Sequence, residues 1–349
     1  MTKLWGVSYT RAEILRRVGD MRQLGGVTPF ELAEGSERGV RGAWLRNAAG
    51  LELAVAAERG MGITELFYRG VPIPHLSAVG TSHPAFYDPR GTAWLRTWPV
   101  GFLTPCGLSQ VGAPNSDGGE ELGLHGQVFG IPARNVSWGA DWQAEDYVIW
   151  MEGTLRETAV FGENLSLKRR VWMRLDEPRF WVEDTVTNHG FAPAPLMLLQ
   201  HINLGFPLID SGARLELGAP APLGGHATTP RDAEAQAGLG DCLRFSPPQP
   251  GYREQVFYHD LTPGADGRVA VRLVNPALGI ALSLRYAKAE YPIFVEWKMV
   301  GEGLYVVGLE PANCHVAGRA AERAAGTLPF LQPQEERKFT LEMEFSAGD

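Results

Sequence analysis

The sequence has few cysteines and no metal-binding motif. Its 349 residues include three cysteines, Cys106, Cys242 and Cys314, which lie far apart and form no CxxC pair. An odd number of widely spaced thiols is typical of reduced cysteines in the cytoplasm, and not of a disulfide framework or a zinc site. The histidines form no HxH or HxxxH pair. We therefore expect neither a metal ion nor any other cofactor.

Long apolar runs and basic runs are also missing. No stretch approaches the roughly 18 uninterrupted apolar residues that cross a bilayer, so we expect no membrane partner. The first residues, MTKLWGVSYTRAEILRR, lack the apolar centre and cleavage site of a signal peptide, which favours a cytoplasmic protein. The formal charge is −8, and no Lys- and Arg-rich segment offsets it. An acidic surface repels phosphate backbones, so nucleic acid is not expected as a partner.

Familiar catalytic and nucleotide-binding motifs are absent as well. There is no GxSxG nucleophile motif. The glycines between 301 and 308 do not form a dinucleotide fingerprint, because no helical pattern follows them. No internal repeat or low-complexity linker divides the chain. We therefore expect a single domain over residues 1–349.

What the sequence does contain is a strong period of two. Apolar residues alternate with polar ones in 179–187, 293–300 and 339–345, and similar runs recur along the chain. The 42 glycines and 25 prolines are scattered, as expected for turns between many short strands. More than ten such strands, with almost no helical pattern, predict an all-β fold: a large antiparallel β-sandwich.

Two segments depart from this pattern. Thr10 and Glu13 form a capping box, and apolar residues then repeat at helical spacing up to Gly25-Gly26, which predicts one peripheral helix at 10–24. The segment 218–251 is rich in Gly, Pro and Ala, and we expect it to be a long loop on the sandwich.

His201 is the first candidate for chemistry. In the strand-like segment 195–208, PLMLLQHINLGFPL, His201 and Asn203 share a face beyond an apolar stem. An imidazole on a rigid strand and partly shielded from water can have its pKa tuned for proton transfer. The alternative is an ordinary core histidine, and the sequence alone does not separate the two.

Glu310 is the second candidate. It shares the apolar face of the strand 303–310 and is followed at once by Pro311, which places it at a sheet rim. A partly desolvated carboxylate has a raised pKa and suits general-base work. The alternative is a structural carboxylate paired with Arg319 or Arg323.

Three weaker candidates complete the set. His125 lies in a glycine-rich stretch, LGLHGQ, which is typical of a loop facing a pocket or of a surface histidine. Lys298 alternates with apolar neighbours and can reach a hydroxyl, although a solvated strand face is the more common explanation. Arg59 precedes a turn in AAERGMGI. The ten tryptophans are compatible with sugar stacking, but most Trp residues pack in a core.

Taken in order, several of these segments form a pattern found in one family. The segments LTPCGL (103–108), LHGQ, DTVTN, LQHINLGFPL and VVGLEPANC resemble the aldose 1-epimerase-like family, and most of all its branch long left as a domain of unknown function. The resemblance runs from about residue 59 to about residue 345. It implies a single galactose-mutarotase-like β-supersandwich that interconverts the anomers of a sugar by acid–base ring opening, without a cofactor.

The resemblance also implies roles for individual residues. His201 corresponds to the acid that protonates the ring oxygen, and Glu310 to the base that takes the proton from the C1 hydroxyl. The resemblance gives His125 as the substrate-positioning histidine, Arg59 as a further sugar-binding residue and Asp260 as a hydroxyl-binding aspartate. Asn203, Lys298 and Asn313 complete the substrate-binding residues that we expect. We expect the His201 and Glu310 side chains to be roughly 5–9 Å apart, with a sugar ring between them.

Other functions stay open at this point. The same fold also suits a carbohydrate-binding or sensing protein without turnover, and less readily a lyase or an epimerase acting at another carbon. The expected partner in every case is a small-molecule sugar, and the expected state is a monomer or a homodimer.

Overall fold

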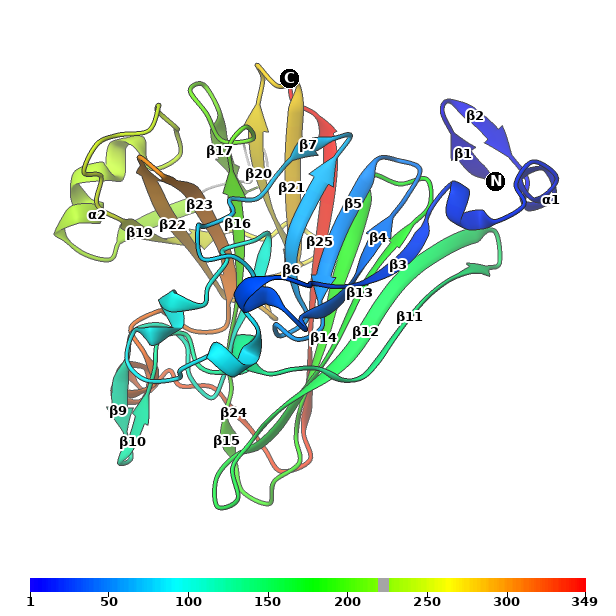
Figure 1. Cartoon of the computed structure of the whole chain (residues 1–349). Coiled ribbons are helices and arrows are strands. Elements are labelled where there is room, and N and C mark those ends of the chain that lie inside the picture. The colour runs from blue at the N-terminus through cyan, green and yellow to red at the C-terminus, as the bar shows by residue number, and fades with distance from the viewer. Residues whose placement is uncertain (219–225) are drawn as a thin grey trace.

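In the computed structural model, residues 1–218 and 226–349 are described, and they form two large antiparallel sheets (Figure 1). This arrangement confirms the predicted all-β fold. The described residues hold three short α-helices, α1 (Arg11–Leu15), α2 (Ala233–Gly238) and α3 (Arg319–Ala325). The 3₁₀ turns are η1 (Met21–Gln23), η2 (Gly35–Glu37), η3 (Pro84–Phe86), η4 (Ala93–Arg96), η5 (Val128–Gly130) and η6 (Leu239–Asp241). None of the described helices is long and apolar enough to cross a membrane.

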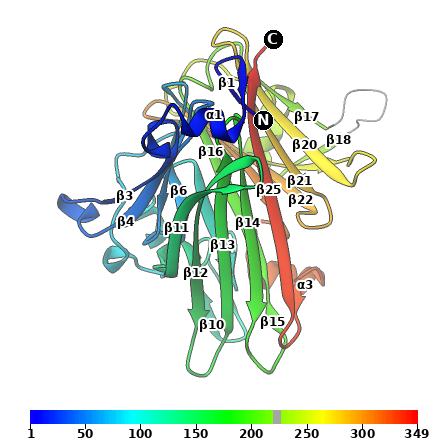
Figure 2. The ribbon, with the colours of Figure 1, turned by 90° about the vertical axis from the view of Figure 1, so that its right-hand side faces the viewer.

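The first sheet has eight strands, and its long members lie side by side in Figure 2. In spatial order they are β11 (Arg134–Gln143), β12 (Asp146–Thr158), β13 (Asn164–Arg174), β14 (Arg179–Asn188), β25 (Glu336–Ala347), β21 (Ile280–Ala287), β20 (Arg268–Asn275) and β17 (Arg214–Leu217).

The second sheet has eleven strands. In spatial order they are β18 (His226–Pro230), β19 (Gln255–Leu261), β22 (Ile293–Gly301), β23 (Leu304–Ala312), β16 (Met197–Gly205), β8 (Leu103–Leu108), β6 (Gly62–Tyr68), β5 (Leu51–Ala56), β4 (Arg41–Arg46) and β3 (Gly26–Glu31), with β7 (Val71–Pro72) paired to β6. Two-stranded sheets join β1 (Thr2–Leu4) to β2 (Val7–Tyr9), β9 (Asn115–Asp117) to β10 (Glu120–Leu122), and β15 (Ala194–Pro195) to β24 (Phe330–Leu331).

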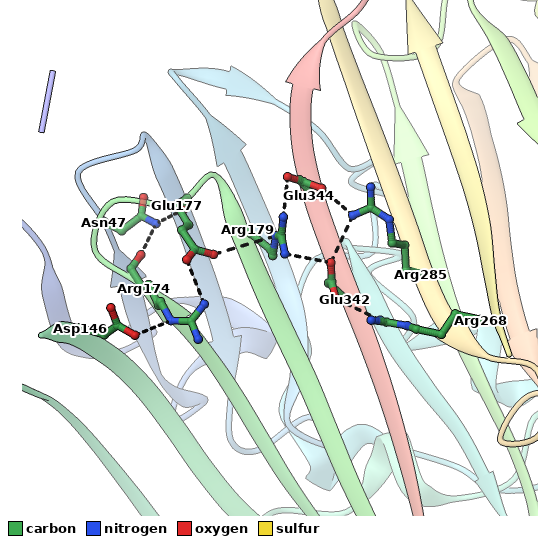
Figure 3. Close-up of polar contacts among 9 residues, drawn as sticks. All are labelled: Asn47, Asp146, Arg174, Glu177, Arg179, Arg268, Arg285, Glu342 and Glu344. Carbon is green, nitrogen blue, oxygen red and sulfur yellow. Dashed lines mark hydrogen bonds and ion pairs between the residues drawn. The ribbon is translucent and has the colours of Figure 1, made fainter. Parts of the chain in front are cut away.

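The main core lies between the two large sheets. One buried apolar cluster contains Leu155 and Leu167 from the first sheet together with Leu204 and Leu309 from the second. Successive residues of a strand point to opposite faces, so each sheet contributes every second side chain to this core. Figure 3 shows the opposite, outer face of the eight-stranded sheet, where arginines and glutamates of neighbouring strands form ion pairs. These ion pairs neutralise the opposite charges on this face of the sheet.

A buried polar network links the two sheets inside the core. Both side chains are almost fully buried, and the guanidinium of Arg169 on β13 donates to both carboxylate oxygens of Asp184 on β14, at 2.8 and 2.6 Å. Gln200 on β16 accepts from Arg169 at 2.8 Å and donates to Asp184 at 2.7 Å. The network therefore ties β16 of the second sheet to the first sheet at the residue next to His201.

The helix predicted at 10–24 is shorter than expected. The capping box is present, since Thr10 Oγ1 accepts from the Glu13 amide at 3.3 Å, but α1 ends at Leu15. Gly19 disfavours helix continuation, and the Asp20 side chain caps η1 instead by accepting from the Arg22 amide at 2.9 Å.

The loop predicted at 218–251 is only partly irregular, and its residues 219–225 lie outside the described residues. The rest contains β18, α2 and η6. Strand β18 pairs with β19, and Asp232 caps α2 by accepting from the Ala235 amide at 3.0 Å. The high Gly, Pro and Ala content hid these elements because each is no longer than six residues.

The buried network gives a prediction for stability. Asp184→Ala leaves the Arg169 guanidinium buried without its counter-ion, and we expect it to lower the free energy of unfolding by about 3–5 kcal/mol. The control is Glu216→Ala, because Glu216 pairs with Arg214 at 2.7 Å on the surface. That change is expected to cost at most about 1 kcal/mol. Urea denaturation of both variants measures the difference, and equal losses would contradict the role given to the buried pair.

Candidate active site

A cavity lies on the outer face of the eleven-stranded sheet. On β16, Leu198 and Leu204 face the core between the sheets, whereas Met197 and Leu199 belong to a second buried cluster on the other face. The segment between β7 and β11, with its cyan helical turns in Figure 1, covers this second face. The cavity has a volume of about 310 Å³ and is lined by Thr92, Trp94, Leu95, Trp98, Gly112, Ala113, Pro114, Leu124, His125, His201, Arg231, Glu254, Val256, Trp297, Glu310 and Val316.

His201 and Glu310 meet in the deepest part of the cavity. Strands β16 and β23 pair antiparallel with Ile202 opposite Leu309, so the register puts His201 directly opposite Glu310. Facing residues on neighbouring strands have Cβ atoms about 4.5–5.5 Å apart, and their side chains can touch. The His201 Nε2 and Glu310 Oε1 atoms are 3.1 Å apart. The expected separation of roughly 5–9 Å is therefore wrong.

Gly308 makes this close approach possible. It lies on β23, two residues before Glu310 and on the same face. A Cβ atom at this position would lie 2.5 Å from Glu310 Oε1 and 3.0 Å from His201 Cε1. Any larger residue at position 308 would therefore push the two side chains apart.

Burial sets the proton affinities of the pair. Both side chains are almost fully buried. Desolvation raises the pKa of Glu310 well above its usual range, and the negative charge of Glu254 adds to the rise. Desolvation lowers the pKa of His201 well below its usual range, and His125 lowers it further. Both shifts favour the uncharged forms, a protonated Glu310 beside a neutral imidazole.

His125 completes the deep end of the cavity. Its backbone is left-handed, with φ at +58°, and its amide donates to the Gly112 carbonyl at 2.9 Å. The imidazole ring centre is 5.8 Å from that of His201 and 5.1 Å from the ring centre of Trp94. Desolvation lowers the pKa of His125 to about 4. The structure thus brings His125, His201 and Glu310, which are far apart in the sequence, to one end of one cavity.

Tryptophans form much of the wall beside this cluster. The ring centre of Trp98 lies 5.0 Å from that of His201, and the ring centre of Trp297 lies 5.5 Å from it. Trp98 is held by its indole N–H, which donates to Thr104 Oγ1 at 3.0 Å. The sequence did not single out these residues, although the alternation of β22 already put Trp297 on a face with Val295.

A charged pair at the opposite end was also missed. Arg231 follows β18, and its Nη2 donates to Glu254 Oε1 at 3.1 Å, just before β19 begins. Both side chains are partly exposed. No local motif marks either residue, because they come from segments that meet only through the pairing of β18 with β19.

The structure does not place Arg59 on the cavity wall. It sits fully buried in the turn between β5 and β6 and donates to the Thr97 carbonyl at 2.8 Å. Its guanidinium lies 4.1 Å from the ring centre of Phe129, and burial lowers its pKa to about 10. Arg59 supports the backbone between two wall tryptophans and does not reach the cavity.

Asn203 and Lys298 are not among the residues that line the cavity. Asn203 shares the face of His201, but it is completely buried and its amide donates to the backbone carbonyl of His201 at 3.0 Å. Lys298 points away from the cavity because its neighbour Trp297 points into it. The Lys298 ammonium donates at 2.6 Å to each of the carbonyls of Asp241 and Arg244.

Asn313 and Asp260 were also expected to bind the substrate, but neither lines the cavity. The Asn313 side chain accepts from the Leu198 amide at 2.7 Å and donates to the Leu196 carbonyl at 2.9 Å, so it fastens the backbone. Asp260 pairs with Lys288 at 3.0 Å on the surface. The arginines considered as partners for Glu310 are also engaged elsewhere, since Arg319 and Arg323 both bind Asp117.

These residues supply proton donors and acceptors in a desolvated space. Within the described residues, no group of three or more His, Cys, Asp or Glu side chains is arranged to hold a metal ion. An acid and a base at 3.1 Å, an additional imidazole and aromatic walls can together move a proton between two oxygens of a small polar ligand.

Solved structures of known proteins share this fold. A candidate aldose 1-epimerase from Klebsiella pneumoniae superposes with a TM-score of 0.85 and 23% identity, over 91% of this chain and 83% of that one. A galactose 1-epimerase from Lactobacillus acidophilus gives 0.59 and 14%, over 93% and 100%. A galactose mutarotase-like protein from Clostridium acetobutylicum gives 0.61 and 14%, over 92% and 99%. At these identities the likeness shows the galactose mutarotase-like fold.

Comparison at the level of sequence gives the family. A search of curated proteins finds no match. Residues 37–345 match a protein family described as a domain of unknown function, DUF4432. Because the match covers most of the chain, the protein belongs to the DUF4432 family and has the galactose mutarotase-like fold.

Proposed function

We propose that the protein is an aldose 1-epimerase-like isomerase that interconverts the two anomers of a small-molecule sugar. The observation that carries this proposal is the His201–Glu310 contact, 3.1 Å long and desolvated at the end of a cavity. A protein that only binds a sugar does not need an acid and a base in contact. The fold shared with a galactose 1-epimerase supports the same reaction class.

The chemistry needs two proton transfers, one at each of the two oxygens bonded to the anomeric carbon. Ring opening adds a proton to the ring oxygen and removes one from the C1 hydroxyl. Rotation about the C1–C2 bond then exposes the other face of the aldehyde, and the reverse transfers close the ring. Both oxygens are bonded to C1, so two adjacent side chains can serve them together. Each positioned acid or base supplies roughly 10²–10⁴-fold.

The pair has the one proton that this cycle requires. The shifts of both pKa values favour the proton on Glu310. Moving that proton across the contact gives an imidazolium and a carboxylate, which are the acid and base that ring opening uses. Sugar hydroxyls that donate to the carboxylate stabilise this charged form. His125, whose ring centre is 5.8 Å from that of His201, would position the substrate by binding a neighbouring hydroxyl.

The shape of the cavity suits a monosaccharide. Its volume of about 310 Å³ is at the small end of the range for small-molecule sites, about 300–1,000 Å³. The wall tryptophans offer flat apolar surfaces, against which the C–H groups of a sugar ring can pack.

Anomer exchange tests the proposal directly. Saturation-transfer NMR measures the exchange of free aldoses with and without the protein, across D-glucose, D-galactose, D-xylose and D-ribose. We expect exchange above the spontaneous rate for at least one sugar. Glu310→Gln keeps the shape but not the base, so kcat should fall about 10²–10⁴-fold with little change in KM.

His201→Gln should behave in the same way, and the double variant should lose less than the product of the two effects, because both groups act in one event. Saturable sugar binding without exchange would instead favour the carbohydrate-binding alternative. Normal turnover by Glu310→Gln with a lower melting temperature would make Glu310 a structural residue.

The spacing at Gly308 generates a separate prediction. In Gly308→Ala the new methyl group meets the ends of the His201 and Glu310 side chains, which can shift without unfolding the strand. A displacement of about 1 Å can cost up to 10²-fold, so we expect kcat to fall about 10–10²-fold while the melting temperature changes little. Gly19→Ala is the control, because nothing lies within 4 Å of a Cβ atom there. Unchanged turnover in Gly308→Ala would show that the contact distance is not important.

Burial of His125 predicts a pH dependence of stability. Its pKa is about 4 when folded against 6.5 when unfolded, so the unfolded chain binds the proton first as pH falls. The contribution of His125 to stability is therefore complete above pH 6.5 and is lost progressively towards pH 4. His125→Asn, which tolerates the positive φ, should lose less stability over this range. Urea denaturation at several pH values measures this, and NMR titration should place the wild-type imidazole near pH 4. Parallel pH profiles for the two proteins would contradict the prediction.

A further inference from the structure

The cavity has a second polar end, away from His201 and Glu310. Among the described residues that line the cavity, Arg231 is the one cation with a fixed charge, and Glu254 lies beside it. The side chain of Arg231 is 35% exposed and that of Glu254 is 52% exposed, against 4% and 3% for His201 and Glu310. The Arg231–Glu254 pair is therefore at the mouth, and the acid–base pair is at the bottom.

The charge at the mouth is negative in spite of the arginine. Arg231 Nε donates to Asp232 Oδ2 at 2.9 Å, and its Nη2 donates to Glu254 Oε1 at 3.1 Å. One guanidinium thus faces two carboxylates, which leaves one net negative charge. A phosphate or sulfonate group entering here would meet an arginine that is already neutralised, and would be repelled by the excess carboxylate.

Glu254 also holds part of the cavity wall. Its Oε2 accepts from the indole N–H of Trp297 at 2.9 Å. The ring centre of Trp297 lies 5.5 Å from that of His201 and 5.7 Å from that of Trp98. Glu254 therefore connects the charged mouth to the aromatic surface that packs against His201.

Between the two polar ends the wall is mainly apolar. Trp98, Leu124, Val256 and Val316 are among the apolar residues that line the cavity. A ligand that matches the whole cavity has a reacting oxygen pair at one end, a hydrocarbon face in the middle and groups that both donate and accept at the other end. Sugar hydroxyls donate to a carboxylate and accept from a guanidinium, whereas a fully ionised phosphate group can only accept.

We propose that Arg231 and Glu254 form a hydroxyl clamp, which binds the end of the sugar away from its anomeric carbon and selects uncharged monosaccharides over their phosphate esters. The clamp rests on the proposed function, because it assigns the substrate class of the same cavity. Glu254 is in addition a positioning residue for Trp297.

The wild-type protein provides the first test. Exchange above the spontaneous rate is measured for D-glucose and D-ribose and for glucose 6-phosphate and ribose 5-phosphate, under identical conditions. We expect kcat/KM to be at least about tenfold higher for the neutral sugar of a pair, and the difference to narrow at 0.5 M NaCl because salt screens the repulsion.

Variants separate the clamp from a general effect of charge. Glu254→Gln removes the excess negative charge and weakens hydroxyl binding. We expect KM for the neutral sugar to rise about tenfold and the preference over the phosphate ester to shrink about tenfold. Glu254→Asp restores the charge and should recover the preference. Glu216→Gln, in the surface pair with Arg214, changes the net charge equally and should alter neither quantity.

The outcomes distinguish the two proposals. A phosphate ester that exchanges as efficiently as its neutral sugar in the wild-type protein overturns the clamp and leaves the isomerase in place. The same holds if Glu254→Gln leaves both KM and the preference unchanged while its melting curve matches that of Glu216→Gln. If no sugar or ester exchanges above the spontaneous rate, the proposed function itself fails, and the clamp fails with it.

Discussion

Strand β16 is buried on both of its faces, and the rest of the site depends on this constraint. Gln200 points between the sheets and binds the Arg169–Asp184 pair, while His201 points the other way into the cavity. A polar side chain on either face is costly unless it has a partner. The inter-sheet network and the cavity are thus fixed to one short segment of backbone, which holds the imidazole on a rigid element.

The same burial determines the electrostatics of the acid–base pair. Water is excluded around His201 and Glu310, so their pKa values move in opposite directions and each side chain favours its neutral form. The absence of a side chain at Gly308 then lets the two groups touch. Desolvation and the 3.1 Å approach together are the physical basis of the chemistry proposed for the cavity.

The two ends of the cavity come from different parts of the architecture. The bottom is built by the central strands β16 and β23, which belong to the common fold. The mouth is built by Arg231 and Glu254, which flank the segment that contains α2. A shared fold does not by itself fix the substrate. The proposed chemistry and the proposed choice of substrate therefore rest on separate segments, which are coupled through Glu254, since its charge adds to the rise in the pKa of Glu310.

The sequence by itself determined the fold class and the faces of the strands. Period-two alternation is a local property, because each residue of a strand points opposite to the next, so it predicted the sandwich and put His201 and Glu310 on apolar faces. Strand register is not local. Only the tertiary structure decided that His201 lies opposite Glu310 at 3.1 Å, where wider spacing was expected.

The hydrogen-bond partners of buried side chains are also non-local and were decided by the tertiary structure. Asn203 lies on the predicted face but binds the backbone, and Asn313 does the same, because a buried amide takes whichever partner is nearest. Arg231 and Glu254 carry no motif and meet at the mouth only because β18 pairs with β19. Alternation along a strand depends on adjacent residues, so it can be predicted from the sequence. Contacts between distant segments exist only once the sheets have formed.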